Sequence, residues 1–392
     1  MKQLCFLSVL LIASPAFAAM DHSAHVGHAN DCADSALACS DKAQPFFDTD
    51  GTLWLAWQGG GRVAVASSHD AKTFTAPVFI TPEAVQADVG ADARPQIVRD
   101  RSGTISVIYG VMQKAGYNGR IYLSQSKDGG QTFSPPAPVT DDPASQRFPS
   151  LSINAQGHVL ATWIDKRAAR AEQSYEGAAL AFSWIDAKGP APMAIAQDNS
   201  CECCRIAGTF DRAGNPIIMW RQIFPGMIRD HAVMTFEGGK PGAMHRVAED
   251  NWNIDACPHH GPAVAVSAEG VYHAAWFTEG EARKGLFYAR SSDRGAHFTE
   301  PEPIGTSANN PGRAQLLSAG GDLWLAWQEF DGEVTSIHAK KRTGTGWTAP
   351  RVIAKTDDAS DLPILIAKDT RAYLSWLTAK EGYRLVALET AP

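Results

Sequence analysis

Leu323-Trp324-Leu325-Ala326-Trp327 decides the fold, because a near copy of it stands at Leu53-Trp54-Leu55-Ala56-Trp57. Each is a short apolar run that follows a Gly- or Asp-containing turn and ends in an aromatic residue, which is typical of a buried β-strand. Five further runs of this kind end at Tyr109, Trp163, Trp220, Trp276 and Trp376. The seven final aromatic residues are separated by steps of 52, 54, 57, 56, 51 and 49 residues. The chain is therefore an internal repeat.

Seven near-equal units of strand character predict an all-β fold, and units of about 50 residues with four short strands are typical of a β-propeller. We predict a single propeller domain over residues 35–392, with seven four-stranded blades and six as the alternative. The last unit ends after its third strand, near Leu388. A strand from residues 35–42 is predicted to complete that blade and so to close the ring.

The composition is that of an ordered globular chain. Of its 392 residues 20% are charged and 9% are aromatic, with 11 Trp, whereas disordered chains are poor in large apolar side chains. The formal net charge is -7, and the longest basic run is Lys340-Lys341-Arg342. Because binding to the phosphate backbone needs a basic surface, nucleic acid is not expected as a partner.

The N-terminus has the features of a secretory signal peptide. A positive start at Met1-Lys2 precedes a mostly apolar run and the small-x-small pattern Ala16-Phe17-Ala18, so residues 1–18 are predicted to be removed. No later stretch approaches 18 uninterrupted apolar residues, and no membrane span is expected. The mature protein is predicted to be periplasmic or secreted, with a flexible His-rich segment over residues 19–34.

A second repeated pattern carries a family resemblance. Residues 126–133 and 291–298 both read S-x-D-x-G-x-x-F, and residues 67–74 are a degenerate copy with His69 at the Asp position. The Ser and Asp side chains can hold a tight turn, and Gly takes the unusual backbone dihedral. The pattern resembles the Asp-box, or BNR repeat, of sialidase-like propellers. These turns specify the fold rather than the chemistry.

The resemblance implies a test for glycosidase activity. Sialidases hold the substrate carboxylate with three arginines, the first in a Phe/Tyr-Arg-Ile-Pro motif, and this sequence lacks that motif. Arginines near the starts of the inner strands are candidates for anion binding: Arg94, Arg147, Arg205 and Arg313. The alternative interpretation is that they form ion pairs with Asp92, Asp198 and Asp361. No catalytic residue is assigned.

Two segments of adjacent units align without a gap. Relative to the turn glycines Gly214 and Gly270, the pattern C-x-C-C of one unit superposes on C-x-H-H of the next. The six residues concerned are Cys201, Cys203, Cys204, Cys257, His259 and His260. Both segments precede the innermost strand of their unit, so the six side chains are expected to gather at one side of the channel mouth.

Thiolates with imidazoles favour soft or borderline metals, and we predict copper, with zinc as the alternative. Surrounding residues are predicted at Arg221, Arg229, Asp230, His231, Trp252 and Asp255. His22, His25 and His28 in the mature N-terminal segment resemble the leaders of copper-handling proteins and are candidate auxiliary ligands. A metal ion is the predicted partner, together with another periplasmic metal-handling protein.

Disulfides are the competing interpretation, because an exported compartment is oxidising. Cys32 and Cys39 are predicted to pair, and Cys201, Cys203, Cys204 and Cys257 could form two more bridges. Redox activity is a third interpretation. Three functions follow: sequestration, delivery or sensing of a soft metal, for which no base–nucleophile pair is needed; an exo-glycosidase that acts on an anionic sugar in the channel; or a disulfide-stabilised propeller that binds proteins.

Overall fold

The computed structural model describes residue 37 and residues 40–90, 92–113, 118–167, 177–344 and 346–389. Strands make up nearly all of its regular structure, and a short 3-10 helix, η4, covers Ser307–Asn309. The prediction of an all-β chain is confirmed. Within the described ranges, no helix has the length and apolar character needed to cross a bilayer.

All strand pairs are antiparallel, and hairpins join successive strands. The first sheet has the order β1 (Ser40–Phe47), β2 (Leu53–Gly59), β3 (Arg62–Ser68), β4 (Val78–Phe79). The second has the order β5 (Gln96–Arg99), β6 (Ile105–Met112), β7 (Gly119–Ser126), β8 (Ala137–Pro138).

A nine-stranded sheet follows, which consists of two groups of strands. The first group contains β9 (Gln146–Ile153), β10 (Val159–Asp165), β11 (Ala178–Asp186), β12 (Gly189–Pro190) and β13 (Ala194–Ser200). The second contains β14 (Ala207–Phe210), β15 (Pro216–Phe224), β16 (Ile228–Glu237) and β17 (Lys240–Arg246). One residue pair, Ser200 with Gln222, joins β13 to β15. This narrow junction lies directly before Cys201.

Three sheets complete the described chain. One has the order β18 (Ala263–Val266), β19 (Tyr272–Glu279), β20 (Lys284–Ser291), β21 (Glu302–Ile304). The next contains β22 (Gly312–Ala319), β23 (Asp322–Phe330), β24 (Thr335–Thr343), β25 (Gly346–Trp347) and β26 (Arg351–Thr356). The last contains β27 (Ile364–Lys368), β28 (Arg371–Thr378) and β29 (Gly382–Ala387).

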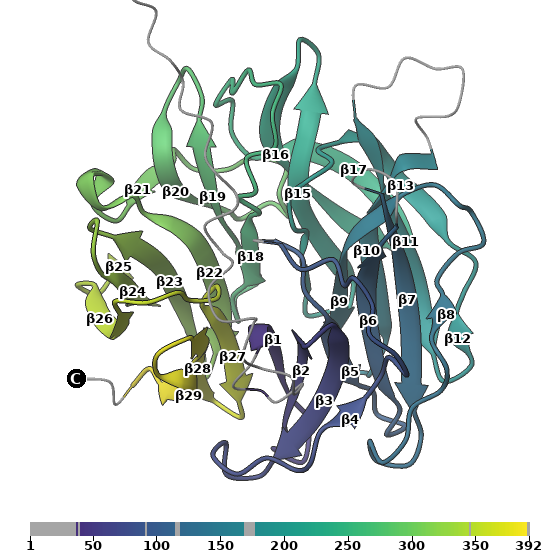
Figure 1. Cartoon of the computed structure of the whole chain (residues 1–392). Coiled ribbons are helices and arrows are strands. Elements are labelled where there is room, and N and C mark those ends of the chain that lie inside the picture. The colour runs from purple at the N-terminus through teal and green to yellow at the C-terminus, as the bar shows by residue number, and fades with distance from the viewer. Residues whose placement is uncertain are drawn as a thin grey trace, which may run out of the picture.

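The first strands of these groups lie around a common centre (Figure 1). Successive first strands contact one another in the order β1, β5, β9, β14, β18, β22, β27. The last of them, β27, contacts β1. The sheets thus have a propeller-like arrangement in which the sequence runs once around the centre. Loops before the first strands reach one end of the central region, and loops after them reach the other.

The seven repeated aromatic residues occupy equivalent places on the second strand of each group. All are buried, with exposed fractions of at most 2% for Trp57, Tyr109, Trp163, Trp220, Trp276, Trp327 and Trp376. Several indole N–H groups reach a side-chain oxygen, as Trp163 does to Asp165 at 3.0 Å and Trp327 to Glu329 at 2.8 Å. A buried indole needs such an acceptor, and the repeat of the sequence is therefore a repeat of the core.

The Ser-x-Asp-x-Gly segments form the expected turns. Ser126 Oγ donates to Asp128 Oδ1 at 2.8 Å and accepts from the Gly130 N–H at 2.8 Å. Ser291 and Asp293 repeat this arrangement. In the degenerate copy, Asp70 rather than His69 receives the backbone N–H groups of the turn. A carboxylate accepts several N–H groups at once, whereas an imidazole nitrogen accepts one.

The N-terminal strand differs from its prediction. The expected strand over residues 35–42 was placed beside the last unit, whereas β1 begins at Ser40 and pairs with β2 in the first sheet. The last sheet has three strands among the described residues. Asp361, just before β27, connects the two ends instead, because its carboxylate accepts the Ala43 N–H at 3.1 Å and pairs with Arg94 at 2.8 Å.

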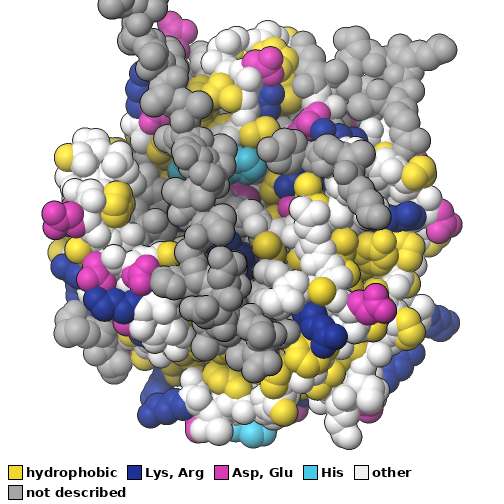
Figure 2. All heavy atoms as spheres, in the orientation of Figure 1, with side chains coloured by type: hydrophobic (Ala, Val, Ile, Leu, Met, Phe, Trp, Pro, Cys, Tyr) yellow, Lys and Arg dark blue, Asp and Glu magenta, His cyan; other side chains and the backbone are white. Residues whose placement is uncertain are grey.

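Charged side chains are mixed on the face of the molecule in Figure 2, where basic and acidic groups are interspersed. The visible face has no continuous basic area among the described residues. This distribution agrees with the low share of charged residues in the chain.

Candidate metal centre

The two Cys/His segments lie in the loops that precede neighbouring first strands. Residues 201–206 connect β13 to β14, and residues 257–262 lie between β17 and β18. Asp92 links the two loops, since its Oδ2 accepts the Arg205 N–H at 3.2 Å and the Gly261 N–H at 2.9 Å. A Cβ at position 261 would lie 2.0 Å from Arg205 Cγ, so glycine is required for this close approach. The two segments lie next to each other, as their alignment predicts, and their place beside a channel stays a prediction.

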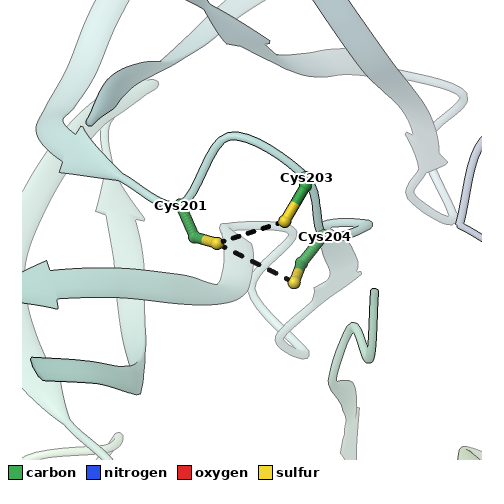
Figure 3. A group of neighbouring side chains, drawn as sticks. All are labelled: Cys201, Cys203 and Cys204. Atoms are coloured by element: carbon green, nitrogen blue, oxygen red, sulfur yellow. Dashed lines mark hydrogen bonds between the residues drawn. The ribbon is translucent and has the colours of Figure 1, made fainter. Parts of the chain in front are cut away.

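Three thiols form the inner part of the cluster. The Cys201 Sγ lies 3.6 Å from the Cys203 Sγ and 4.0 Å from the Cys204 Sγ, and Figure 3 shows the three sulfur atoms turned toward one another. All three sulfur atoms lie within 4.8 Å of one another. The exposed fractions of these residues are only 1–2%. We call Cys201, Cys203 and Cys204 the inner triad.

Cys203 belongs to a second group as well. Ligand atoms of Cys203, Cys257 and His259 also lie within 4.8 Å of one another. Cys257 is exposed and His259 is half-buried, so this group faces solvent. We call Cys203, Cys257 and His259 the outer triad. The structure thus brings together five of the six predicted ligands from two separate loops.

His260 is the predicted ligand that lies outside both triads. Its ring stacks on Phe277 with a centroid distance of 4.2 Å and an interplanar angle of 21°. Burial, with the nearby arginines Arg313 and Arg221, holds the pKa of His260 well below its ordinary value. The gap-free alignment with Cys204 does not carry over to the side chains, because His259 has a positive φ of 50° that turns the chain at this point.

The spacing of the sulfur atoms fits a metal ion. Metal–sulfur bonds of about 2.3 Å place the sulfur atoms of a three- or four-coordinate site about 3.8–4.0 Å apart. The two sulfur–sulfur distances of 3.6 and 4.0 Å agree with this geometry. A disulfide needs about 2.05 Å, and the four described cysteines are free thiols.

Two buried arginines supply positive charge beside the inner triad. Arg229 donates to the Cys201 Sγ at 3.2 Å, and the carboxylate nearest to it is Asp255, at 3.6 Å and exposed to solvent. Arg221 is 1% exposed, donates to three backbone carbonyls and lies over the Trp252 ring at 4.7 Å. Among the described ion pairs, Arg221 has no carboxylate partner.

The thiols share protons unequally. Hydrogen bonds from Cys203 and Cys204 hold the pKa of Cys201 well below its ordinary value, with a further contribution from the charges of Arg221 and Arg229. The same hydrogen bonds raise the pKa of Cys203, which acts as a donor. A hydrogen bond from Cys203 also lowers the pKa of Cys257 to about 7. Thiolate, the form that binds metals, is therefore accessible at neutral pH.

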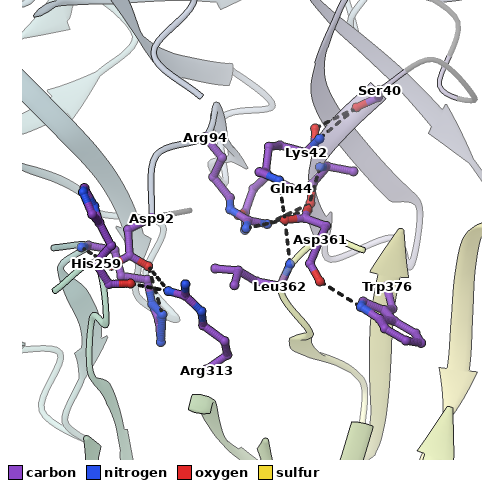
Figure 4. A network of polar contacts seen from close by, with 12 residues as sticks. Ser40, Lys42, Gln44, Asp92, Arg94, His259, Arg313, Asp361, Leu362 and Trp376 are labelled. Atoms are coloured by element: carbon purple, nitrogen blue, oxygen red, sulfur yellow. Dashed lines mark hydrogen bonds and ion pairs between the residues drawn. The ribbon is translucent and has the colours of Figure 1, made fainter. Parts of the chain in front are cut away.

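The four arginines predicted as anion ligands are all engaged by carboxylates. Arg94 binds Asp361 through two nitrogen atoms, and Arg147 does so with Asp88, at 2.7 and 2.8 Å. Asp92 pairs with Arg313 (Figure 4), and it pairs with Arg205 as well. Asp88 rather than Asp198 is thus the partner of Arg147. The sequence offered little to identify Asp88 as this partner, because Asp88 lies 59 residues from Arg147 in the chain.

A cavity of about 430 Å³ lies toward the opposite ends of the first strands. Its lining includes Gln44 of β1, Gln96 of β5, Ser152 of β9, Asn154 of the β9–β10 connection and Phe210 of β14. The thiols precede the start of β14, whereas this cavity lies at its end. The two features therefore occupy different ends of the central region.

Several predictions fall outside the described residues. The Cys32–Cys39 pairing, the auxiliary ligands His22, His25 and His28, and the signal peptide over residues 1–18 all lie there. They stay predictions. The expected surrounding residues Arg221, Arg229 and Trp252 do lie beside the cluster, whereas Asp230 binds Arg246.

No model of a protein family matches the chain, and no curated protein sequence does. The fold, however, is shared with solved structures. An ulvan lyase, described as a new polysaccharide-lyase family, is 11% identical with a TM-score of 0.58, over 90% of this chain and 92% of that one. The virginiamycin B lyase of Staphylococcus aureus is 9% identical with a TM-score of 0.52, over 90% and 96%. A Hadza microbial sialidase is 13% identical with a TM-score of 0.50, over 87% and 77%. At these identities the likeness shows the fold alone, which is a sialidase-like β-propeller architecture.

Proposed function

We propose that this chain is an exported propeller that binds monovalent copper through the thiols of its inner triad and serves in sequestration, delivery or resistance. The observation that carries the proposal is the inner triad itself: three buried thiols whose sulfur atoms lie within 4.8 Å of one another. Buried thiols without a ligand have no structural need to converge. Thiolates favour Cu(I) among the metals available to such a site.

The charge around the triad supports a monovalent ion over zinc. Three thiolates and one Cu(I) carry two negative charges, which Arg221 and Arg229 offset. A divalent ion in the same place would leave a net positive charge in a buried region, where an unbalanced charge is costly. Zinc is therefore the weaker candidate.

The proposed architecture is a ring of seven blades. The seven first strands contact one another in a cycle, and the narrow Ser200–Gln222 junction divides the nine-stranded sheet into two blades. Asp361 then joins the last blade to the first. The ring holds the loops of the fourth and fifth blades side by side, which is what the two Cys/His segments require.

Export fits this role. The leader over residues 1–18 would deliver the chain to the periplasm, and the His-rich segment over residues 19–34 offers imidazoles that could pass copper to the cluster. We propose another periplasmic metal-handling protein as the partner. Its surface would have to reach Cys257, the exposed cysteine of the cluster.

The test is the metal content of the mature chain purified without oxygen. Copper should be retained at about one or more ions per chain, and the double variant Cys201→Ser with Cys204→Ser should retain about one ion fewer. The control, Cys32→Ser with Cys39→Ser, removes the same number of cysteines from the N-terminal segment of the sequence and should keep its copper. Retention of zinc alone, or of no metal after copper has been offered, would overturn the proposal.

The glycosidase alternative has a separate readout. Arg94, Arg147 and Arg313 are occupied by Asp361, Asp88 and Asp92, so an anionic sugar would have to displace a carboxylate. Cleavage of a fluorogenic sialoside that is lost in Arg94→Ala or Arg313→Ala would establish this alternative. A protein with copper but without cleavage supports the proposal above.

A further inference from the structure

We propose that the cluster holds two monovalent copper ions, one in the inner triad and one in the outer triad, with the Cys203 sulfur as the ligand that both ions share. This inference rests on the proposed copper function and deepens it. It assigns a second metal position, at the surface of the protein.

The geometry of the shared sulfur carries the proposal. Cys201, Cys203 and Cys204 converge on one point, and Cys203, Cys257 and His259 converge on another, each within 4.8 Å. One sulfur atom thus belongs to two complete sets of three ligands. A thiolate has more than one lone pair, so a single cysteine can bind two soft ions.

The charge balance is consistent with two ions. Four thiolates carry four negative charges, and two Cu(I) ions with Arg221 and Arg229 supply four positive ones. Adding the second ion together with the Cys257 thiolate therefore leaves the balance of the site unchanged. Each thiol that binds releases its proton to solvent, and no electron is transferred.

Burial gives the two positions different tasks. The inner residues are 1–2% exposed, whereas Cys257 is exposed and His259 is half-buried. An ion from a donor protein would meet the outer triad first. Exchange of ligands at Cys203 would then carry it into the inner triad without release to water. The outer position is thus where copper enters and leaves.

The experiment is an anaerobic titration with Cu(I) in competition with a chromogenic chelator, with the number of bound ions counted by native mass spectrometry. Wild type should bind two ions. Cys257→Ser and His259→Ala should each bind one, and Cys203→Ser should lose both high-affinity positions. His260→Gln is the matched control, since this neighbouring imidazole lies outside both triads, and it should still bind two.

Absorption spectroscopy at the copper edge supplies a second measurement. A copper–copper scattering path is expected in wild type and should disappear in Cys257→Ser, and near-ultraviolet circular dichroism verifies that each variant is folded. One ion in wild type, or two ions in folded Cys257→Ser, would overturn this inference and leave the copper function standing. No bound copper at all would overturn both.

Discussion

Arg229 and Arg221 are the two residues whose charge supports the proposed choice of a monovalent ion. Both lie beside the inner triad, and neither has a buried carboxylate to neutralise it among the described residues. An arginine of this kind stabilises thiolate through charge and through a directed N–H donor. In the proposed site, these two arginines would balance the negative charge of the thiolates that a monovalent ion does not neutralise.

Arg229→Gln should weaken Cu(I) binding by about tenfold or more, because a hydrogen bond to a charged group contributes about 1.5–3 kcal/mol. Competition with a chromogenic chelator measures the change. Arg229→Lys, which keeps the charge, should lose less. Equal affinities for wild type and Arg229→Gln would show that the arginine does not act on the thiolates.

At the same scale, five of the six residues expected in the cluster lie together in the structure, and His260 lies outside it. The shared spacing of C-x-C-C and C-x-H-H reports backbone position, and both loops do lie before their first strands. The spacing of residues in the sequence contains no information on side-chain rotamers, so it could not show that His260 stacks on Phe277. Asp92, which links the two loops, was expected only as an ion-pair partner.

The turn after the third strand has the same hydrogen bonds in two sheets of this protein. In the second sheet its glycine, Gly130, has φ of 85° and faces the Trp54 ring of the first sheet. A Cβ there would lie 2.7 Å from a ring carbon. The Trp54 indole is held by Asp48 at 2.9 Å, so the ring has little freedom to move. The turn thus packs one sheet against the next.

Gly130→Ala should lower the free energy of unfolding by about 2 kcal/mol or more, since it adds overpacking to the cost of a positive φ. Gly129→Ala is a close control: it also has a positive φ, of 74°, but nothing lies within 4 Å of its Cβ. Denaturant titration gives the difference between the two variants. The packing role would be refuted by identical losses of stability.

Such turns could be predicted from the sequence because their side chains form hydrogen bonds with residues only two to four positions away in the chain. The degenerate copy was read one residue out of register, at His69 instead of Asp70, since the Ser-Ser pair at its start allows two alignments. Only the hydrogen bonds of the folded turn decide between them.

At the scale of the whole molecule, Asp361 joins the last sheet to the first through its carboxylate. This carboxylate binds Arg94 in β5's preceding loop and the backbone of β1 (Figure 4). Arg94 and Asp361 are both buried, at 6% and 3% exposure. Removal of one partner from a buried ion pair leaves an uncompensated charge.

Asp361→Asn should therefore destabilise the protein by about 3 kcal/mol. Glu381→Gln, which removes an ion pair with Arg384 at the surface, should change stability by less than about 0.5 kcal/mol. Thermal and denaturant midpoints of both variants test the contrast. Equal midpoints would mean that the contact between the end sheets adds nothing to stability.

The repeat predicts the sheets and their buried aromatic residues, because the apolar residues of each unit pack into the core of that unit's own sheet. It fails at the ends, where β1 lies in the first sheet and not in the last. Contacts between distant units leave no periodic signal, and the Ala43–Asp361 hydrogen bond spans 318 residues.

That separation has a consequence for the order in which the protein is made. Both Cys/His loops are complete once residue 266, the end of β18, has emerged, but Asp361 comes almost 100 residues later. Contacts between distant parts of a chain form late and slowly. A growing chain therefore contains all the cysteines of the cluster well before its two ends can meet, and we expect the contact between Asp361 and Ala43 to form last.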